Sequence, residues 1–268
     1  MTDDRKVRTA PHPVLTEYYG SDAERARFVT SLFDSSARHY DRLCQLMSFG
    51  SGQWYRRQAL LRAGLKAGMS VLDVATGTGL VARSALQIVG NPRAVVGLDP
   101  SAGMLHEARK VSAGPLVQGQ VETLPFPRAH FDVLTFGYAL RHVTDLEVAF
   151  TECRRVLKPG GRLLVLEISR ARSRATRGVL RLYFLHVLPA IMWLSTRSTP
   201  ARMLSQYYWE TIDACVPPET IMEVLRRSGF TDVHRTVFGG FLSEYVAVKP
   251  PEANHRMASS EGATPRKP

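Results

Sequence analysis

The sequence predicts an α/β fold: a doubly wound, mostly parallel seven-stranded sheet that ends in an antiparallel hairpin. Three observations support this class. Short apolar runs alternate with amphipathic helical patterns from residue 70 onward, which is typical of parallel strands joined by helical crossovers. A glycine-rich turn joins the first run to the helical pattern that follows it. The last two runs, 232–238 and 242–248, are separated by so short a turn that they must pair antiparallel, because a parallel pair needs a long crossover.

Each element follows from the local hydrophobic pattern. Helical spacing of apolar residues, such as Phe28, Leu32 and Phe33, predicts N-terminal helices over 22–67. The pattern predicts further helices at 79–89, 101–110, 145–157 and 218–228, the third of them stopped by the LKPGG segment. Strands are expected at 70–74, 94–98, 115–118, 131–136, 162–168, 232–238 and 242–248. An apolar, arginine-flanked helical insertion is expected at 176–210.

Composition predicts one globular domain over 23–249. The chain has 268 residues, of which 44% are hydrophobic, enough for a packed core. We expect 1–22 to be a flexible extension and 250–268 a disordered tail, because both are polar and rich in proline or small residues. The three cysteines lie far apart, so neither a disulfide framework nor a metal site is expected. This cysteine usage favours a reducing, cytoplasmic setting, and the N-terminal stretch has no apolar core that would act as a secretory signal.

The net charge of +11 raises the question whether the basic residues face solvent, an anionic membrane surface or a nucleic acid. Six arginines occur from Arg162 to Arg181, with no acidic residue after Glu167. A solvated loop and the surface of an anionic membrane both remain open, whereas no recognition motif supports a nucleic-acid partner. The apolar stretch 179–194 is interrupted by Arg181, His186 and Pro189 and is shorter than the ~20 residues of a membrane span. We therefore expect at most peripheral membrane contact, and a homo-oligomer stays open.

The segment 71–82, VLDVATGTGLVA, predicts an adenosine cofactor. Gly77 and Gly79 let the chain turn sharply after a strand and approach a ligand closely. Asp99 ends the next strand, about twenty residues after the last glycine, where a carboxylate accepts from ribose hydroxyls. The string also satisfies G-x-G-x-x-A, so NAD must be weighed. Asp73 before the turn would repel a pyrophosphate but favours a sulfonium, and the terminal hairpin suits a methyltransferase sheet, so we predict S-adenosylmethionine.

The chain resembles a known family. Over 28–249 it is similar to the S-adenosylmethionine-dependent C-methyltransferases of ubiquinone and menaquinone biosynthesis. The matching segments include VLDVATGTG, VETLPFP (121–127), FDVLTFGYALRHV (131–143), RVLKPGGRLLVLE (155–167) and SGFTDV (228–233). The resemblance implies the doubly wound fold and S-adenosylmethionine. It also implies cofactor contacts at Thr78, Asp99, Gln120 and Val121, and at Gly137, where the family has a serine-like contact.

The chain departs from this family where the resemblance places the acceptor. The family reads approximately F-G-L-R-N-V where this chain has 138–143, YALRHV, and its closing strand is LSEYVAVK. We therefore expect a small lipophilic acceptor, either a prenylated quinol or a related aromatic or terpenoid specialised metabolite. Methylation of oxygen or nitrogen on the same fold stays open. A nucleic-acid methyltransferase, suggested only by charge, and a non-catalytic cofactor binder are the remaining alternatives.

Two residues of this loop are the catalytic candidates. His142 titrates in the physiological range and can accept a proton from a phenol, although it could also just replace the hydrogen bond of an asparagine. Arg141 matches the family's arginine; because it stays protonated, we expect it to hold a water or stabilise a phenolate. Tyr40 and Tyr138 are predicted to form a substrate wall, with Tyr19 in an N-terminal cap. The insertion is expected either to form an apolar lid or to pack as ordinary core.

Overall fold

A computed structural model describes residues 9–112, 114–171 and 173–251. Its centre is one seven-stranded sheet in the order β3-β2-β1-β4-β5-β7-β6. The first five strands pair in parallel and β7 runs antiparallel to both β5 and β6, which confirms the predicted sheet and its terminal hairpin. The strands are β1 (Val71–Val74), β2 (Val95–Asp99), β3 (Leu116–Gln118), β4 (Phe131–Gly137), β5 (Leu157–Ile168), β6 (Thr231–Phe238) and β7 (Leu242–Val248).

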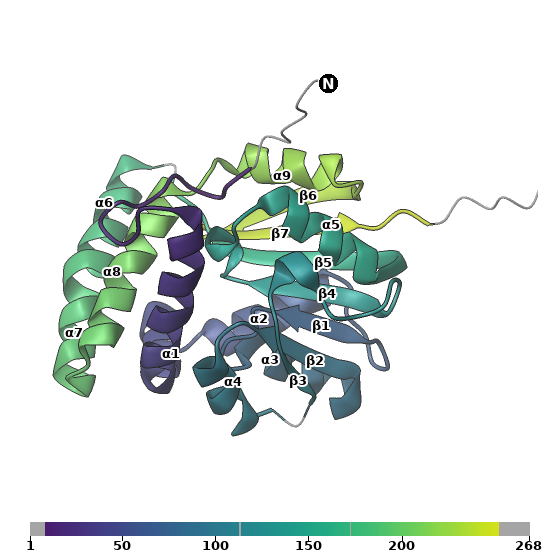
Figure 1. Ribbon diagram of the computed structural model, residues 1–268, viewed down its shortest axis with the longest axis horizontal. Helices are drawn as coiled ribbons and strands as arrows, with labels where there is room; N and C mark the ends of the chain where they lie inside the picture. The colour runs from purple at the N-terminus through teal and green to yellow at the C-terminus, as the bar shows by residue number, and fades with distance from the viewer. Residues whose placement is uncertain (1–8, 113, 172, 252–268) are drawn as a thin grey trace, which may run out of the picture.

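Helices cover both faces of the sheet (Figure 1). On one face, α5 (Leu146–Val156) and α9 (Pro218–Arg227) bury Phe150 and Val224 against the strands. On the other, α2 (Gly52–Arg62) and α3 (Leu80–Val89) bury Leu60 and Ala85. A further helix, α4 (Ala102–Arg109), follows β2. The helix α5 ends where predicted, but β5 begins at Leu157 rather than at residue 162, because Leu157 already pairs with Phe131 across a bulge.

A separate helical layer stands beside the sheet. It contains α1 (Asp22–Met47), α6 (Arg174–Leu182), a π-helical turn η4 (Tyr183–Val187), α7 (Leu188–Thr196) and α8 (Thr199–Ala214). Figure 1 shows these helices grouped at one end of the molecule, with α1 between α8 and the strands. A second apolar core holds the layer together, with Leu32 from α1, Leu188 from α7 and Tyr208 from α8.

The helix that runs through α6 and α7 is longer than the sequence suggested. It extends over Arg174–Thr196, 23 residues, and an 18-residue window within it has a mean hydropathy of 1.4, so by length and composition alone it could cross a membrane. The predicted apolar stretch was shorter because it left out the arginine-containing first turns. One face of this helix buries Phe184, Leu188 and Met192 in the second core.

The N-terminal segment differs from the expectation of a flexible extension in the part that is described. The backbone N–H of Leu146 donates to the carbonyl of Thr9 at 3.0 Å, and that of Val216 donates to Pro11 at 2.8 Å. His12 is buried, and its Nε2 lies 3.0 Å from the guanidinium of Arg25. Because arginine can only donate, Nε2 accepts and Nδ1–H donates to the carbonyl of Pro13 at 2.7 Å. Backbone hydrogen bonds and the buried guanidinium of Arg25 thus fix this segment, for which composition predicted no fixed structure. Residues 1–8 and 252–268 lie outside the described ranges.

Candidate active site

The glycine-rich turn after β1 is held by Asp73. Gly77 and Gly79 have φ values of 58° and 83°, which favour glycine, and α3 begins directly after them. One carboxylate oxygen of Asp73 accepts from the Thr76 hydroxyl at 2.7 Å and the Ala82 N–H at 3.0 Å, and the other accepts from Thr135 at 2.6 Å. Burial raises the pKa of Asp73 to about 6. Asp73 therefore stabilises the turn from the buried side, and it does not line the cavity.

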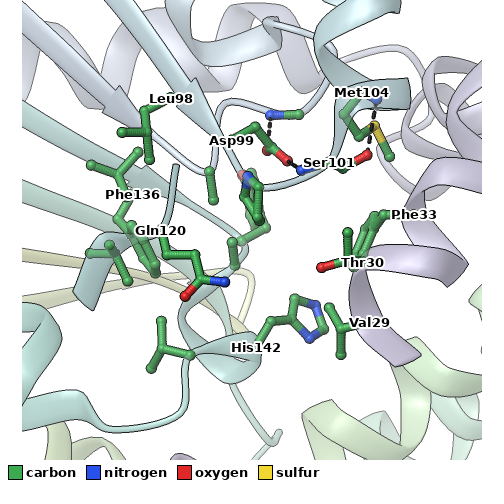
Figure 2. A pocket seen from close by; sticks show the side chains of 18 of the residues that line it. Val29, Thr30, Phe33, Leu98, Asp99, Ser101, Met104, Gln120, Phe136 and His142 are labelled. Carbon is green, nitrogen blue, oxygen red and sulfur yellow. Dashed lines mark hydrogen bonds between the residues drawn. The ribbon is translucent and has the colours of Figure 1, made fainter. Parts of the chain in front are cut away.

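Asp99 brings the turn and the end of β2 together. Its carboxylate accepts from the Gly77 N–H at 2.8 Å and from the Ser101 N–H at 2.9 Å. Burial raises the pKa of this carboxyl to about 6, opposed by those two hydrogen bonds. The side chain still reaches the cavity wall, as Figure 2 shows. A carboxylate oxygen has two lone pairs, so Asp99 retains acceptor capacity for hydroxyl groups of a ligand.

A cavity lies between the carboxyl ends of the strands and α1. Figure 2 shows His142 and Gln120 facing Val29, Thr30 and Phe33 across it. Most of the wall is apolar, with the sheet side supplied by Val74, Leu98, Val121, Phe136 and Gly137 and the helical side by Val29, Phe33, Tyr40, Met104 and Tyr208.

Eight of the predicted site residues lie in the cavity wall. They are Gly77, Asp99, Gln120, Val121 and Gly137 of the expected cofactor set, and Tyr40, Tyr138 and His142 of the expected acceptor set. Tyr40 donates or accepts a hydrogen bond with Tyr208 at 3.0 Å between hydroxyls, and Tyr138 has a positive φ of 60° and faces the Arg56 guanidinium.

Five predicted residues lie outside the wall: Asp73, Thr78, Gly79, Arg141 and Tyr19. Thr78 is buried and donates to Asp41 of α1 at 2.5 Å, so it links the glycine turn to the helix above it. Gly79 is the N-cap of α3 and has a left-handed backbone conformation. Tyr19 packs against Phe28, with ring centroids 5.9 Å apart, in the second core.

Arg141 is fully buried behind the wall. Its guanidinium pairs with Glu167, donates to the Thr211 hydroxyl at 3.1 Å and lies 4.6 Å from the ring centroid of Tyr208. The Arg141 carbonyl in turn accepts from Arg25 at 2.7 Å. These contacts fix the short turn η3 (Leu140–His142), so Arg141 positions the residue that follows it.

His142 stands in the wall as a neutral imidazole, and the expectation that it titrates in the physiological range was wrong. Burial holds its pKa well below the usual value, and the positive charges of Arg141 and Arg25 lower it further. The ring stacks on Tyr207 at 5.5 Å and meets the edge of Phe33 at 5.2 Å. Among the described residues neither ring nitrogen has a hydrogen-bond partner. An unpaired buried polar group of this kind is costly unless a ligand satisfies it.

Sequence reasoning missed the contribution of α1. Val29, Thr30 and Phe33 line the cavity, but their helical spacing indicated only a buried face and not which surface covers it. Ser101 and Met104 at the start of α4 were also missed. Tyr208 lies in the insertion that was expected to form a lid or ordinary core, and it belongs to both the wall and the second core.

The residues present fit an adenosine-bearing methyl donor. Asp99 offers acceptor lone pairs to ribose hydroxyls, and Leu98, Val121 and Met104 provide an apolar slot beside it. A Cβ added to Gly77 would lie 3.8 Å from Tyr40 Cε1. Because glycine has no Cβ, the turn stays open toward the cavity. Fold and site together define the class of S-adenosylmethionine-dependent methyltransferases.

Comparisons with known proteins agree with this class and narrow it. The chain belongs to the ubiE/COQ5 methyltransferase family, whose family model matches residues 20–249. It is 36% identical over 220 residues to the ubiquinone/menaquinone biosynthesis C-methyltransferase UbiE of Shewanella oneidensis, covering 80% of this chain and 86% of that relative. The chain is therefore an S-adenosylmethionine-dependent methyltransferase of the UbiE/COQ5 type.

Solved structures share the fold at lower identity. A Thermotoga maritima methyltransferase described as a possible histamine N-methyltransferase superposes with a TM-score of 0.59 at 20% identity, covering 82% of this chain and 98% of that one. A Haemonchus contortus phosphoethanolamine N-methyltransferase, solved with S-adenosylhomocysteine, gives a TM-score of 0.52 at 20% identity, covering 74% and 53%. These likenesses concern the fold alone.

Proposed function

We propose that this methyltransferase transfers a methyl group to a ring carbon of a small lipophilic aromatic acceptor that carries a ring hydroxyl, as quinols do. The observation that carries the proposal is the neutral, unpaired imidazole of His142 in an otherwise apolar wall. A phenolic hydroxyl would satisfy that nitrogen, while the ring would lie against Phe33, Tyr40 and Tyr138. The Shewanella oneidensis relative is named a ubiquinone/menaquinone biosynthesis C-methyltransferase, which agrees with an acceptor of this class.

Asp99 and Gln120 would hold the donor at the sheet side of the cavity. When bound, S-adenosylmethionine supplies an electrophilic methyl on a positively charged sulfur. Asp99 would accept from its ribose hydroxyls, and the Gln120 amide, which points into the cavity in Figure 2, offers both a donor and an acceptor. The α1 side chains close the opposite wall and keep water from the reacting centre.

On the acceptor side His142 would accept a hydrogen bond from the ring hydroxyl, and it would take that proton as the new bond forms, because the hydroxyl of the methylated, positively charged ring is strongly acidic. This raises the electron density at the neighbouring ring carbon, which forms the new carbon–carbon bond as the carbon–sulfur bond of the donor breaks. The proton on that carbon is then lost, which restores the aromatic ring, and the hydroxyl recovers its own proton from the imidazole. The products balance as methylated acceptor, S-adenosylhomocysteine and one proton. Arg141 and Glu167 contribute by fixing the turn that carries His142.

Acceptors outside the quinone class are favoured by one specific observation. Tyr138, Ala139 and His142, the three positions where the chain departs from the F-G-L-R-N-V pattern, all lie in the cavity wall. A phenolic aromatic or terpenoid specialised metabolite is therefore the second candidate acceptor, and it uses the same hydroxyl-to-His142 contact.

The test uses acceptors deuterated at the ring carbon beside the hydroxyl. The purified protein is incubated with S-adenosylmethionine and a short-chain prenylated naphthoquinol, a prenylated benzoquinol or a phenolic terpenoid, and products are weighed by mass spectrometry. C-methylation adds a methyl group and loses the deuterium, whereas O- or N-methylation retains it. A methylated product that keeps its deuterium contradicts the proposal, as does the absence of product from every phenolic acceptor while S-adenosylhomocysteine still binds.

A further inference from the structure

The long helix of α6 and α7 carries a second apolar face that points away from the protein. Val179, Leu182 and Leu194 are 67%, 59% and 71% exposed, and Trp193 is 47% exposed. Their spacing repeats at helical intervals, so they form one stripe, opposite the buried Phe184, Leu188 and Met192. Large exposed apolar patches on one helix mark a surface that contacts something else.

Positive charge is concentrated in and near this helix. The sequence between Glu167 and Glu210 contains seven arginines and neither aspartate nor glutamate. Arg170 and Arg177 pair with Asp213, whereas Arg174 and Arg181 are exposed and make no ion pair with any described residue. Arg197 ends the helix with its guanidinium 5.9 Å from the Trp193 ring centroid. An apolar stripe flanked by arginines and free of acidic side chains complements a surface that is apolar inside and anionic outside.

We propose that the exposed face of α6 and α7 docks on an anionic phospholipid bilayer, with the helix lying in the plane of the membrane. Apolar side chains enter the headgroup region while arginines contact lipid phosphates, as amphipathic surface helices do. The helix does not cross the bilayer in this arrangement, because Phe184, Leu188 and Met192 remain in the second core. A nucleic acid would match the arginines but leave the apolar stripe unsatisfied.

Docking here would also place the cavity close to the membrane. The helix α7 packs on α8, whose Tyr208 lines the cavity wall. Phe49, at the end of α1, is 85% exposed and lies beside Tyr183 of the same helical layer, with ring centroids 5.7 Å apart. The docked face and one wall of the cavity therefore belong to the same helical layer.

Vesicle cosedimentation tests the proposal without reference to methyl transfer. The full chain is mixed with vesicles of phosphatidylglycerol and phosphatidylcholine or of phosphatidylcholine alone, at low and at high salt. We expect binding to the anionic vesicles that weakens in high salt, because surface attraction of arginines is screened by ions. No binding to anionic vesicles would overturn the proposal, and so would equal binding to neutral ones.

Two double variants locate the surface. Arg174→Gln with Arg181→Gln removes two lipid-facing charges, and Trp193→Ala with Leu194→Ala removes apolar side chains; each is expected to weaken binding about tenfold or more. The matched controls are Arg93→Gln with Arg128→Gln, exposed arginines near the starts of β2 and β4, and Val148→Ser with Val237→Ser on α5 and β6. Controls that lose as much binding as the test variants would contradict this location.

Trp193 reports its own environment. In a Trp54→Phe background the remaining tryptophans are the buried Trp209 and the exposed Trp193, so a blue shift of emission on adding anionic vesicles comes from Trp193. No shift would contradict insertion of the stripe. Sedimentation that shows a dimer in lipid-free solution, broken by Trp193→Ala with Leu194→Ala, would also overturn the proposal, because a second copy would then cover the face.

Discussion

A Cβ added to Gly137 would lie 2.8 Å from Cγ2 of Val81, closer than side chains approach in proteins. Gly137 ends β4 in the cavity wall, and Val81 is a buried residue of the first turn of α3. The glycine that replaces the family's serine-like contact is therefore matched to the valine that packs on it.

We expect Gly137→Ser to destabilise the protein by about 1–3 kcal/mol, because overpacking a core forces neighbours to shift. Val81→Ala alone should cost about 1–2 kcal/mol through the cavity it leaves. The double variant should be more stable than the sum of the two predicts, since each change relieves the other. Urea unfolding measures all three free energies; strictly additive losses would contradict the pairing.

Asp99→Asn should weaken S-adenosylhomocysteine binding about 10- to 100-fold, because a charged acceptor for hydroxyl groups is lost. The affinity of the unmodified protein should also fall as pH drops through about 6, the pKa to which burial raises this carboxyl, and be greatest above it. Calorimetry across pH checks both effects. Glu223→Gln, an exposed carboxylate on α9, is the control that should change neither. An Asp99→Asn variant with the same affinity and pH profile would refute the role.

His142→Ala should lower kcat by about 100-fold or more while S-adenosylhomocysteine binds within about threefold of the original affinity. The imidazole faces the acceptor side of the cavity and has no partner among the described residues, so its loss removes no hydrogen bond seen there. Steady-state kinetics and calorimetry separate the two quantities, with His106→Ala, an exposed histidine of α4, as the control. Near-normal turnover in His142→Ala would remove His142 from the mechanism.

His12→Gln should make the free energy of unfolding depend less steeply on pH at acidic pH. Burial, followed by the charge of Arg25, lowers the pKa of His12 from 6.5 to about 4. Between these values the unfolded chain binds a proton that the folded protein does not, so His12 makes stability rise with pH by about 1.4 kcal/mol per unit. Its contribution is complete above pH 6.5 and is lost as pH falls toward 4. Urea unfolding at several pH values should show a shallower slope for His12→Gln and an unchanged one for His106→Gln.

Local sequence predicted the sheet well, and it predicted that the glycine turn and Asp99 lie at strand ends. The strand ends, the glycine turn and Asp99 all follow from apolar periodicity and turn chemistry, which act between residues near in the chain. Even there the role of Asp73 differed from expectation, because its three hydrogen bonds turn it inward to Thr76, Ala82 and Thr135.

The acceptor half depended on contacts that no local pattern contains. The N-terminal segment is fixed by hydrogen bonds from Leu146 and Val216, more than a hundred residues away. Arg141 looked like a site residue by resemblance, yet its pairing with Glu167 and Thr211 holds it behind the wall.

The sequence by itself determined that this chain builds a doubly wound sheet and places the glycine turn and Asp99 at the ends of neighbouring strands, because strand period, glycine conformation and carboxylate spacing are properties of neighbouring residues. Only the tertiary structure decided that α1 closes the cavity and that His142 enters its wall neutral and unpaired. Those outcomes arise from desolvation and from contacts such as Thr78 with Asp41 and Arg25 with the Arg141 carbonyl, which exist only once distant segments have packed.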